Sequence, residues 1–65
     1  MDLKQLQYFV VSVESGSFKK AADTLYTTQP HISKSIKNLE TELNVQLLER
    51  KARGVEVTES GKKIY

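Results

Sequence analysis

The chain has 65 residues, 38% of them hydrophobic, with no cysteine and a formal net charge of +2. This length limits it to one small domain with a marginal core, and the missing thiols exclude disulfides and thiolate metal sites. No apolar run approaches the roughly 20 residues that span a bilayer, so we expect no membrane partner, and the absence of cysteine fits a reducing cytosol.

Two amphipathic helices are predicted in the first part of the chain. The first, over about residues 2–15, has apolar residues every three or four positions. These residues, which we expect to face the core, are Leu3, Leu6, Val10 and Val13, with Phe9 beside them. Gly16 suits the left-handed position after a helix end, and Ser17 is a typical N-cap. A second, short helix is therefore predicted over about residues 18–25.

A third helix is predicted over about residues 29–43. Thr28 is its expected N-cap, and Pro30 then falls in the first turn, where a missing N–H costs no intrahelical hydrogen bond. Asn44 is a plausible end. The buried stripe has helical spacing and consists of Ile32, Ile36, Leu39 and Leu43.

The pattern changes after the third helix. Residues 46–50 and 55–58 are short segments, the second strictly alternating, and the turn between them ends in Gly54. They predict a two-stranded hairpin. Thr58 then resembles a new N-cap, followed by a fourth helix within residues 59–65, although Gly61 weakens that prediction.

The outward side of the third helix has an unusual composition. At about 100° per residue, the positions opposite the buried stripe can be assigned, and the first turn adds two flanking side chains. The front half presents Gln29, Pro30, His31, Ser33, Lys34 and Lys37. It has amide, hydroxyl, imidazole and ammonium groups but no carboxylate before Glu40. These groups are suited to base edges and phosphates.

Basic charge is concentrated in two blocks. Residues 17–39 carry four lysines against one aspartate, and residues 50–53 carry Arg50, Lys51 and Arg53, while residues 40–49 are acidic. A helix, a short turn and a helix with a polar front form a helix-turn-helix, whose second helix enters the major groove. The hairpin, tipped by Lys51 and Arg53, would be a wing, with Arg53 suited to a narrow minor groove. The alternative for both blocks is an ordinary solvated surface.

The chain resembles the N-terminal DNA-binding domain of LysR-type transcriptional regulators over its whole length. The residues that carry the resemblance are Gly16-Ser17-Phe18, Ala21-Ala22, Leu25, Gln29-Pro30, Ser33, Ile36, Leu39-Glu40, Leu43, Leu47, Glu49-Arg50, Thr58-Glu59 and Gly61. The resemblance implies a mainly α, three-helix winged helix-turn-helix with a two-stranded hairpin wing, at residues 1–58, and the start of a linker helix at residues 59–65.

Further expectations follow from this resemblance. It implies a bacterial, cytoplasmic regulator that binds double-stranded DNA and forms a homodimer through the linker helix of a longer parent. A small-molecule effector would bind only a C-terminal domain absent from this chain. Gln29, Pro30, Ser33 and Lys34 would lie in the major groove, Thr28 and Lys37 near phosphates, and Arg53 in the minor groove.

An enzyme and a protein-interaction module are the alternatives to DNA binding. An enzyme is not expected, because the chain has no phosphate loop, no cysteine and no paired histidine and carboxylate at ligand spacing. No cofactor or metal is expected, since His31 has no partner ligand. The remaining alternative is a protein-interaction module whose basic face binds an acidic partner.

Four side chains carry structural expectations. Tyr8 and Tyr26 lie off the main stripes and are expected to be partly exposed. Tyr26 could contact a phosphate or pack on the core. Glu40 follows the buried stripe and is interpreted as structural, with Arg50 as its expected ion-pair partner.

Overall fold

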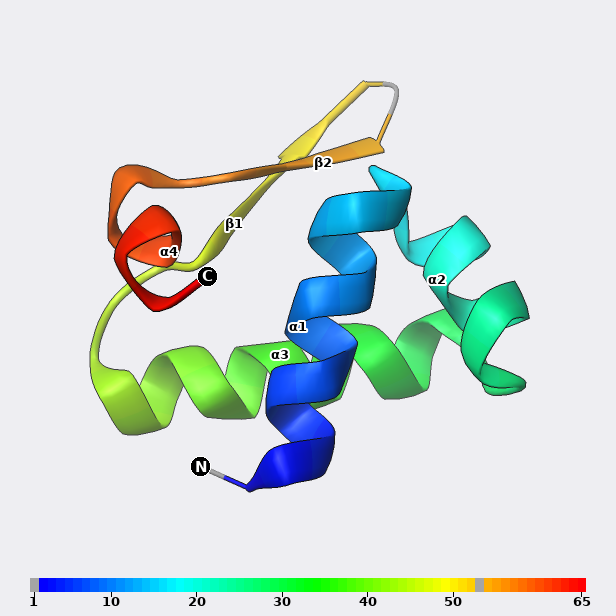
Figure 1. The fold of residues 1–65 in the computed structure, drawn as a ribbon, viewed down its shortest axis with the longest axis horizontal. Coiled ribbons are helices and arrows are strands. Elements are labelled where there is room, and N and C mark those ends of the chain that lie inside the picture. Colours follow the sequence, from blue (N-terminus) through cyan, green and yellow to red (C-terminus); the bar gives the residue numbers. More distant parts are fainter. Residues whose placement is uncertain (1, 53) are drawn as a thin grey trace.

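The computed structural model describes residues 2–52 and 54–65. Within them it contains helices and one two-stranded antiparallel sheet (Figure 1). The elements are α1 (Leu3–Ser15), α2 (Phe18–Leu25), α3 (Gln29–Leu43), β1 (Leu48–Lys51), β2 (Gly54–Val57) and α4 (Glu59–Ile64). The predicted order is confirmed, with strand ends one or two residues from those expected. Within the described ranges, no helix combines the length and apolarity that crossing a membrane requires.

Local signals at the helix ends are confirmed. Ser17, Thr28 and Thr58 are N-caps whose hydroxyl oxygens each accept a hydrogen bond from a backbone N–H three residues later. Gly16 and Asn44 follow α1 and α3 in the left-handed conformation, with φ of 74° and 57°. These caps satisfy backbone groups that a helix leaves unpaired at its ends.

The core lies where the three helices meet. Figure 1 shows α1 crossing α3 with α2 beside them, and each pair of these helices is in contact. The largest fully buried apolar side chains are Phe9, Ile32, Leu39 and Leu47. Ile32, Ile36 and Leu39 are all buried, so the predicted inward face of α3 is confirmed and the opposite face is free.

The predicted inward face of α1 is partly wrong. Leu3 is 84% exposed, whereas Tyr8 is only 7% exposed. The buried residues of α1 are Tyr8, Phe9 and Ser12, and the Ser12 hydroxyl satisfies its polarity by donating to the Tyr8 carbonyl oxygen over 2.7 Å. Apolar residues cover more than half of this helix, so periodicity alone does not identify which of them face the core.

The hairpin is anchored to the turn between α1 and α2. Leu48 pairs with Val57 and Lys51 with Gly54. The Val55 N–H donates to the Gly16 carbonyl oxygen over 3.0 Å. Gly54 has φ of 146°, and a Cβ atom there would lie 2.0 Å from the same oxygen. The close approach therefore requires glycine, and it fixes the hairpin relative to the helices.

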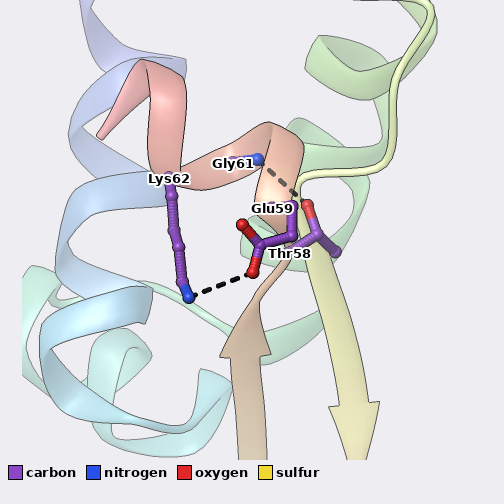
Figure 2. A network of polar contacts seen from close by, with 4 residues as sticks. All are labelled: Thr58, Glu59, Gly61 and Lys62. Atoms are coloured by element: carbon purple, nitrogen blue, oxygen red, sulfur yellow. Dashed lines mark hydrogen bonds and ion pairs between the residues drawn. The ribbon is translucent and has the colours of Figure 1, made fainter.

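The start of α4 is held by its cap and by a close contact with the segment before β1. Figure 2 shows the Gly61 N–H donating to the Thr58 hydroxyl over 3.0 Å and the Lys62 ammonium 3.2 Å from the Glu59 carboxylate. A Cβ atom at Gly61 would lie 2.4 Å from the Leu47 carbonyl oxygen. Gly61 thus permits the packing of α4, and interpreting it as evidence against this helix was wrong.

The end of the chain returns to α1. The Tyr65 hydroxyl donates to the Glu14 carboxylate over 3.0 Å. The Tyr65 ring also lies edge-on to Phe9, with centroids 6.3 Å apart. The hydrogen bond to Glu14 is the main reason that the pKa of Tyr65 is raised from its ordinary 10.0, with desolvation and the Glu14 charge adding to it.

We expect Glu14→Gln to lower the pKa of Tyr65 toward 10.0, because the neutral phenol would lose its charged acceptor. The contact stabilises the fold only while Tyr65 is protonated. Its contribution is complete below the unfolded pKa and is lost as pH rises through the higher folded pKa. Titrating the ring carbon resonances of Tyr65 by NMR measures the shift. An unchanged titration in Glu14→Gln would assign the raised pKa to another cause.

Candidate nucleic-acid interface

The N-terminal half of α3 presents its polar side chains to solvent. Thr28 begins the helix, and its hydroxyl oxygen accepts from the His31 N–H over 3.3 Å. Pro30 lies in the first turn, where its ring costs no backbone hydrogen bond. The predicted residues on this face are all exposed except Ser33, which is half-buried: Gln29, Pro30, His31, Lys34 and Lys37.

A shallow hollow runs along this face and reaches the hairpin. Its lining consists of Gln29, Pro30, Ser33, Lys34, Lys37 and Arg50. Five of these six residues come from α3, and Arg50 comes from β1. The structure therefore places the predicted base-reading residues around one surface and adds an arginine that had not been assigned to it. The hollow is lined by hydrogen-bonding groups and cations without a carboxylate.

Arg50 contacts both helices of the helix-turn-helix. Its guanidinium donates to the Ser33 hydroxyl over 2.8 Å and lies 5.0 Å from the centre of the Phe18 ring. The predicted ion pair between Glu40 and Arg50 is wrong. The Glu40 carboxylate instead accepts from the N–H groups of Leu47 and Leu48, over 2.7 and 3.2 Å. Glu40 lies eight residues before the start of β1, and a carboxylate at that distance can still accept from backbone N–H groups, which a search for ion pairs overlooks.

Of the two basic residues predicted at the tip of the hairpin, only Lys51 lies within the described residues. Lys51 is exposed at the end of β1, and its ammonium lies 3.6 Å from the Glu49 carboxylate. Such an exposed pair is weak and leaves Lys51 available to a phosphate. Arg53, the expected minor-groove residue, lies outside the described residues. A second hollow joins the hairpin to the start of α2, with Lys19, Arg50 and Lys51 on its lining.

The aromatic residues near α3 differ in exposure. Tyr26 is 96% exposed, so the alternative that it packs on the core is wrong and the phosphate contact stays a prediction. Tyr8 is buried, contrary to expectation, and its ring lies edge-on to His31 with centroids 5.5 Å apart. His31 is thereby oriented on the helix surface. Among residues 2–52 and 54–65, no three His, Cys, Asp or Glu side chains are grouped to hold a metal ion.

Comparison with known sequences identifies related proteins. The family model described as bacterial regulatory helix-turn-helix protein, lysR family, matches residues 3–62. The HTH-type transcriptional regulator BenM of Acinetobacter baylyi is 52% identical over the whole chain, which covers 21% of that protein. The nitrogen assimilation regulatory protein nac of Klebsiella aerogenes is 46% identical, again over the whole chain and 21% of that protein. The chain thus spans about a fifth of the length of these relatives.

Solved structures match the fold closely. The CbnR DNA-binding domain in complex with DNA superposes with a TM-score of 0.95 at 41% identity, covering 98% of this chain and 74% of that one. The BenM DNA-binding domain with its benA site 1 DNA gives a TM-score of 0.93 at 52% identity, covering 100% of this chain and 73% of that one. The predicted winged helix-turn-helix fold is confirmed.

Proposed function

The chain belongs to the lysR family of bacterial regulatory helix-turn-helix proteins, and from this premise we propose that it binds duplex DNA sequence-specifically. Helix α3 would enter the major groove with its N-terminal half, and the β1–β2 hairpin would act as the wing. The observation that carries this proposal is the exposed front of α3, which bears polar and cationic groups without a carboxylate and continues into the hollow beside Arg50. Two similar structures, of CbnR and BenM domains, are complexes with DNA.

The geometry supports different roles for these side chains. Gln29, Pro30, Ser33 and Lys34 lie on the exposed front of α3 and would contact base edges, with Gln29 suited to adenine. His31 flanks them on the first turn. Thr28, Lys37 and Lys51 would contact phosphates, which position the domain without reading sequence. For Arg53, which lies outside the described residues, the minor-groove contact is proposed from the sequence and the family resemblance alone.

A longer parent would use this domain as one part of a regulator. We propose residues 1–58 as the DNA-binding unit and residues 59–65 as the start of a linker helix that pairs two subunits. The effector site would lie in a separate C-terminal domain, since the chain covers only 21% of the relative BenM. The parent would act in the bacterial cytoplasm as a non-enzymatic transcription regulator.

We expect Gln29→Ala and Lys37→Ala to affect DNA binding in different ways. Gln29→Ala should relax preference at one base position, by about 1–3 kcal/mol for a good contact. Lys37→Ala should weaken binding to all duplexes alike. It should also reduce the magnitude of the salt slope by about 0.9, since one fewer phosphate is neutralised. Fluorescence anisotropy with matched and scrambled duplexes at several salt concentrations separates the two effects.

The same measurements test the competing function. A basic face that serves an acidic protein partner would bind duplex DNA without preferring any sequence. Equal affinity of the unmutated chain for selected and scrambled duplexes would therefore contradict sequence-specific recognition. A Gln29→Ala variant that loses affinity equally for both duplexes would remove Gln29 from the base contacts.

A further inference from the structure

Arg50 is the residue at the interface that the sequence patterns did not assign to DNA. It projects from β1 to the front of α3, where its guanidinium donates to the Ser33 hydroxyl over 2.8 Å. A guanidinium has donors only, so Ser33 must be the acceptor in this bond. The direction of the hydrogen bond is therefore determined by chemistry, although hydroxyl protons rotate freely in other contexts.

This bond restricts what Ser33 can offer to a ligand. A serine hydroxyl has one O–H donor and two acceptor lone pairs, and Arg50 occupies one lone pair. A second donor approaching the same oxygen would meet the positive charge of the guanidinium. The O–H group, in contrast, stays free and becomes more strongly polarised. Ser33 is thus prepared to donate toward the solvent side of α3.

The position of Arg50 is held by a second contact. The guanidinium lies 5.0 Å from the centre of the Phe18 ring, at the start of α2, in a cation–π arrangement. Arg50 is not among the cations that form ion pairs within the described residues. Arg50 also lines the hollow that is lined by Ser33, Lys34 and Lys37. The arginine is oriented by a neutral hydroxyl and an aromatic ring and keeps its full charge.

We propose that Arg50 is a positioning and specificity-determining residue, which makes Ser33 a hydrogen-bond donor toward DNA. Resting on the proposed function, this means that the base position facing Ser33 presents an acceptor: N7 or O6 of guanine, N7 of adenine or O4 of thymine. The N4 amino group of cytosine is disfavoured there, because it needs an acceptor that lies next to the guanidinium. The recognition surface is therefore shared by α3 and β1.

Selection of bound duplexes from a random pool tests this proposal. The unmutated chain, Ser33→Ala, Arg50→Met and the double variant are compared, with Lys37→Met as a control that removes one cation from the same hollow. Ser33→Ala and Arg50→Met should both reduce discrimination at one shared base position, by about 5-fold or more, as loss of one base contact does. The double variant should lose no more discrimination than the larger single effect. Lys37→Met should lower all affinities with the preference intact.

Several results would overturn the role of Arg50. One is an Arg50→Met variant that behaves like Lys37→Met, because then the guanidinium contacts only phosphates. Another is a change of preference at a position that Ser33→Ala does not affect. Cytosine as the base that Ser33 faces in the unmutated chain would also overturn it, whatever the Arg50 variants do, because its major-groove edge offers only the N4 amino group. Absence of any enriched sequence for the unmutated chain would instead contradict the proposed function itself.

Discussion

Gly54→Ala should destabilise the domain by about 3 kcal/mol or more, because two penalties act at the same atom. The residue has φ of 146°, a conformation that side chains other than glycine rarely adopt. The new Cβ atom would also lie 2.0 Å from the Gly16 carbonyl oxygen, which accepts the hydrogen bond of the Val55 N–H. The backbone segments at Gly54 and Gly16 must move apart, and the hairpin then loses its attachment to the α1–α2 turn.

Gly16→Ala is the matched control for this substitution. Gly16 has φ of 74°, yet a Cβ atom there would meet no heavy atom of the rest of the protein within 4 Å, apart from its own residue and its immediate neighbours along the chain. Its cost is therefore confined to the left-handed conformation, about 1–2 kcal/mol. Thermal unfolding followed by circular dichroism compares the variants, and 1 kcal/mol corresponds to about 4–8 °C in a domain of this size. Equal losses in the two variants would show that the contact between Gly54 and Gly16 contributes nothing.

The structural basis of this prediction was not available from the sequence. The sequence places Gly54 in a turn, which is correct, but the turn signal does not reveal that its backbone touches Gly16, 38 residues earlier in the numbering. The same is true of Gly61, whose propensity argues against a helix while its packing against Leu47 requires glycine. Propensity describes a local preference, whereas glycine is required at these two positions by contacts between elements that are distant in the chain.

Helix ends and the direction of α3 were predictable because their signals are local. Thr28, Pro30 and Asn44 delimit α3, and Ile32, Ile36 and Leu39 have one spacing that leaves a single inward face. In α1, apolar residues surround most of the helix, and only the positions of α2 and α3 decide that Tyr8 is buried while Leu3 is exposed. Periodicity therefore determines orientation where the apolar stripe is narrow and fails where it is wide.

Part of the candidate site was also predictable from local signals, and part was not. Residues of α3 could be assigned from one helix face, since a helix brings them together whatever the rest of the chain does. Arg50 could not, because its contact with Ser33 spans 17 residues and two elements. Opposite charge suggested Glu40 as its partner, but the carboxylate is used by two backbone N–H groups. Pairing by charge overlooks the backbone as a competing partner.

Glu40→Ala is expected to cost about 2–4 kcal/mol, because it removes the acceptor of two charge-assisted hydrogen bonds at once. The half-buried Glu40 carboxylate accepts from the N–H groups of Leu47 and Leu48 through the same oxygen. Leu47 is fully buried, so water cannot readily replace the lost acceptor at its N–H. Glu40→Gln keeps an oxygen in this position and should lose only the contribution of the charge, about 1 kcal/mol.

Glu56→Gln is the control for charge alone, because Glu56 is exposed on β2, and its effect should stay within about 0.5 kcal/mol. Urea unfolding measures all three variants, and a Glu40→Ala loss no larger than that of Glu56→Gln would contradict the role assigned to Glu40.

The loss of the Glu40 hydrogen bonds should also affect DNA recognition. Leu48 begins the strand that carries Arg50, so a loosened connection between α3 and β1 also weakens the hydrogen bond that orients Ser33. Glu40→Ala should therefore reduce base discrimination at the Ser33-dependent position, although Glu40 is not among the proposed base-contacting residues.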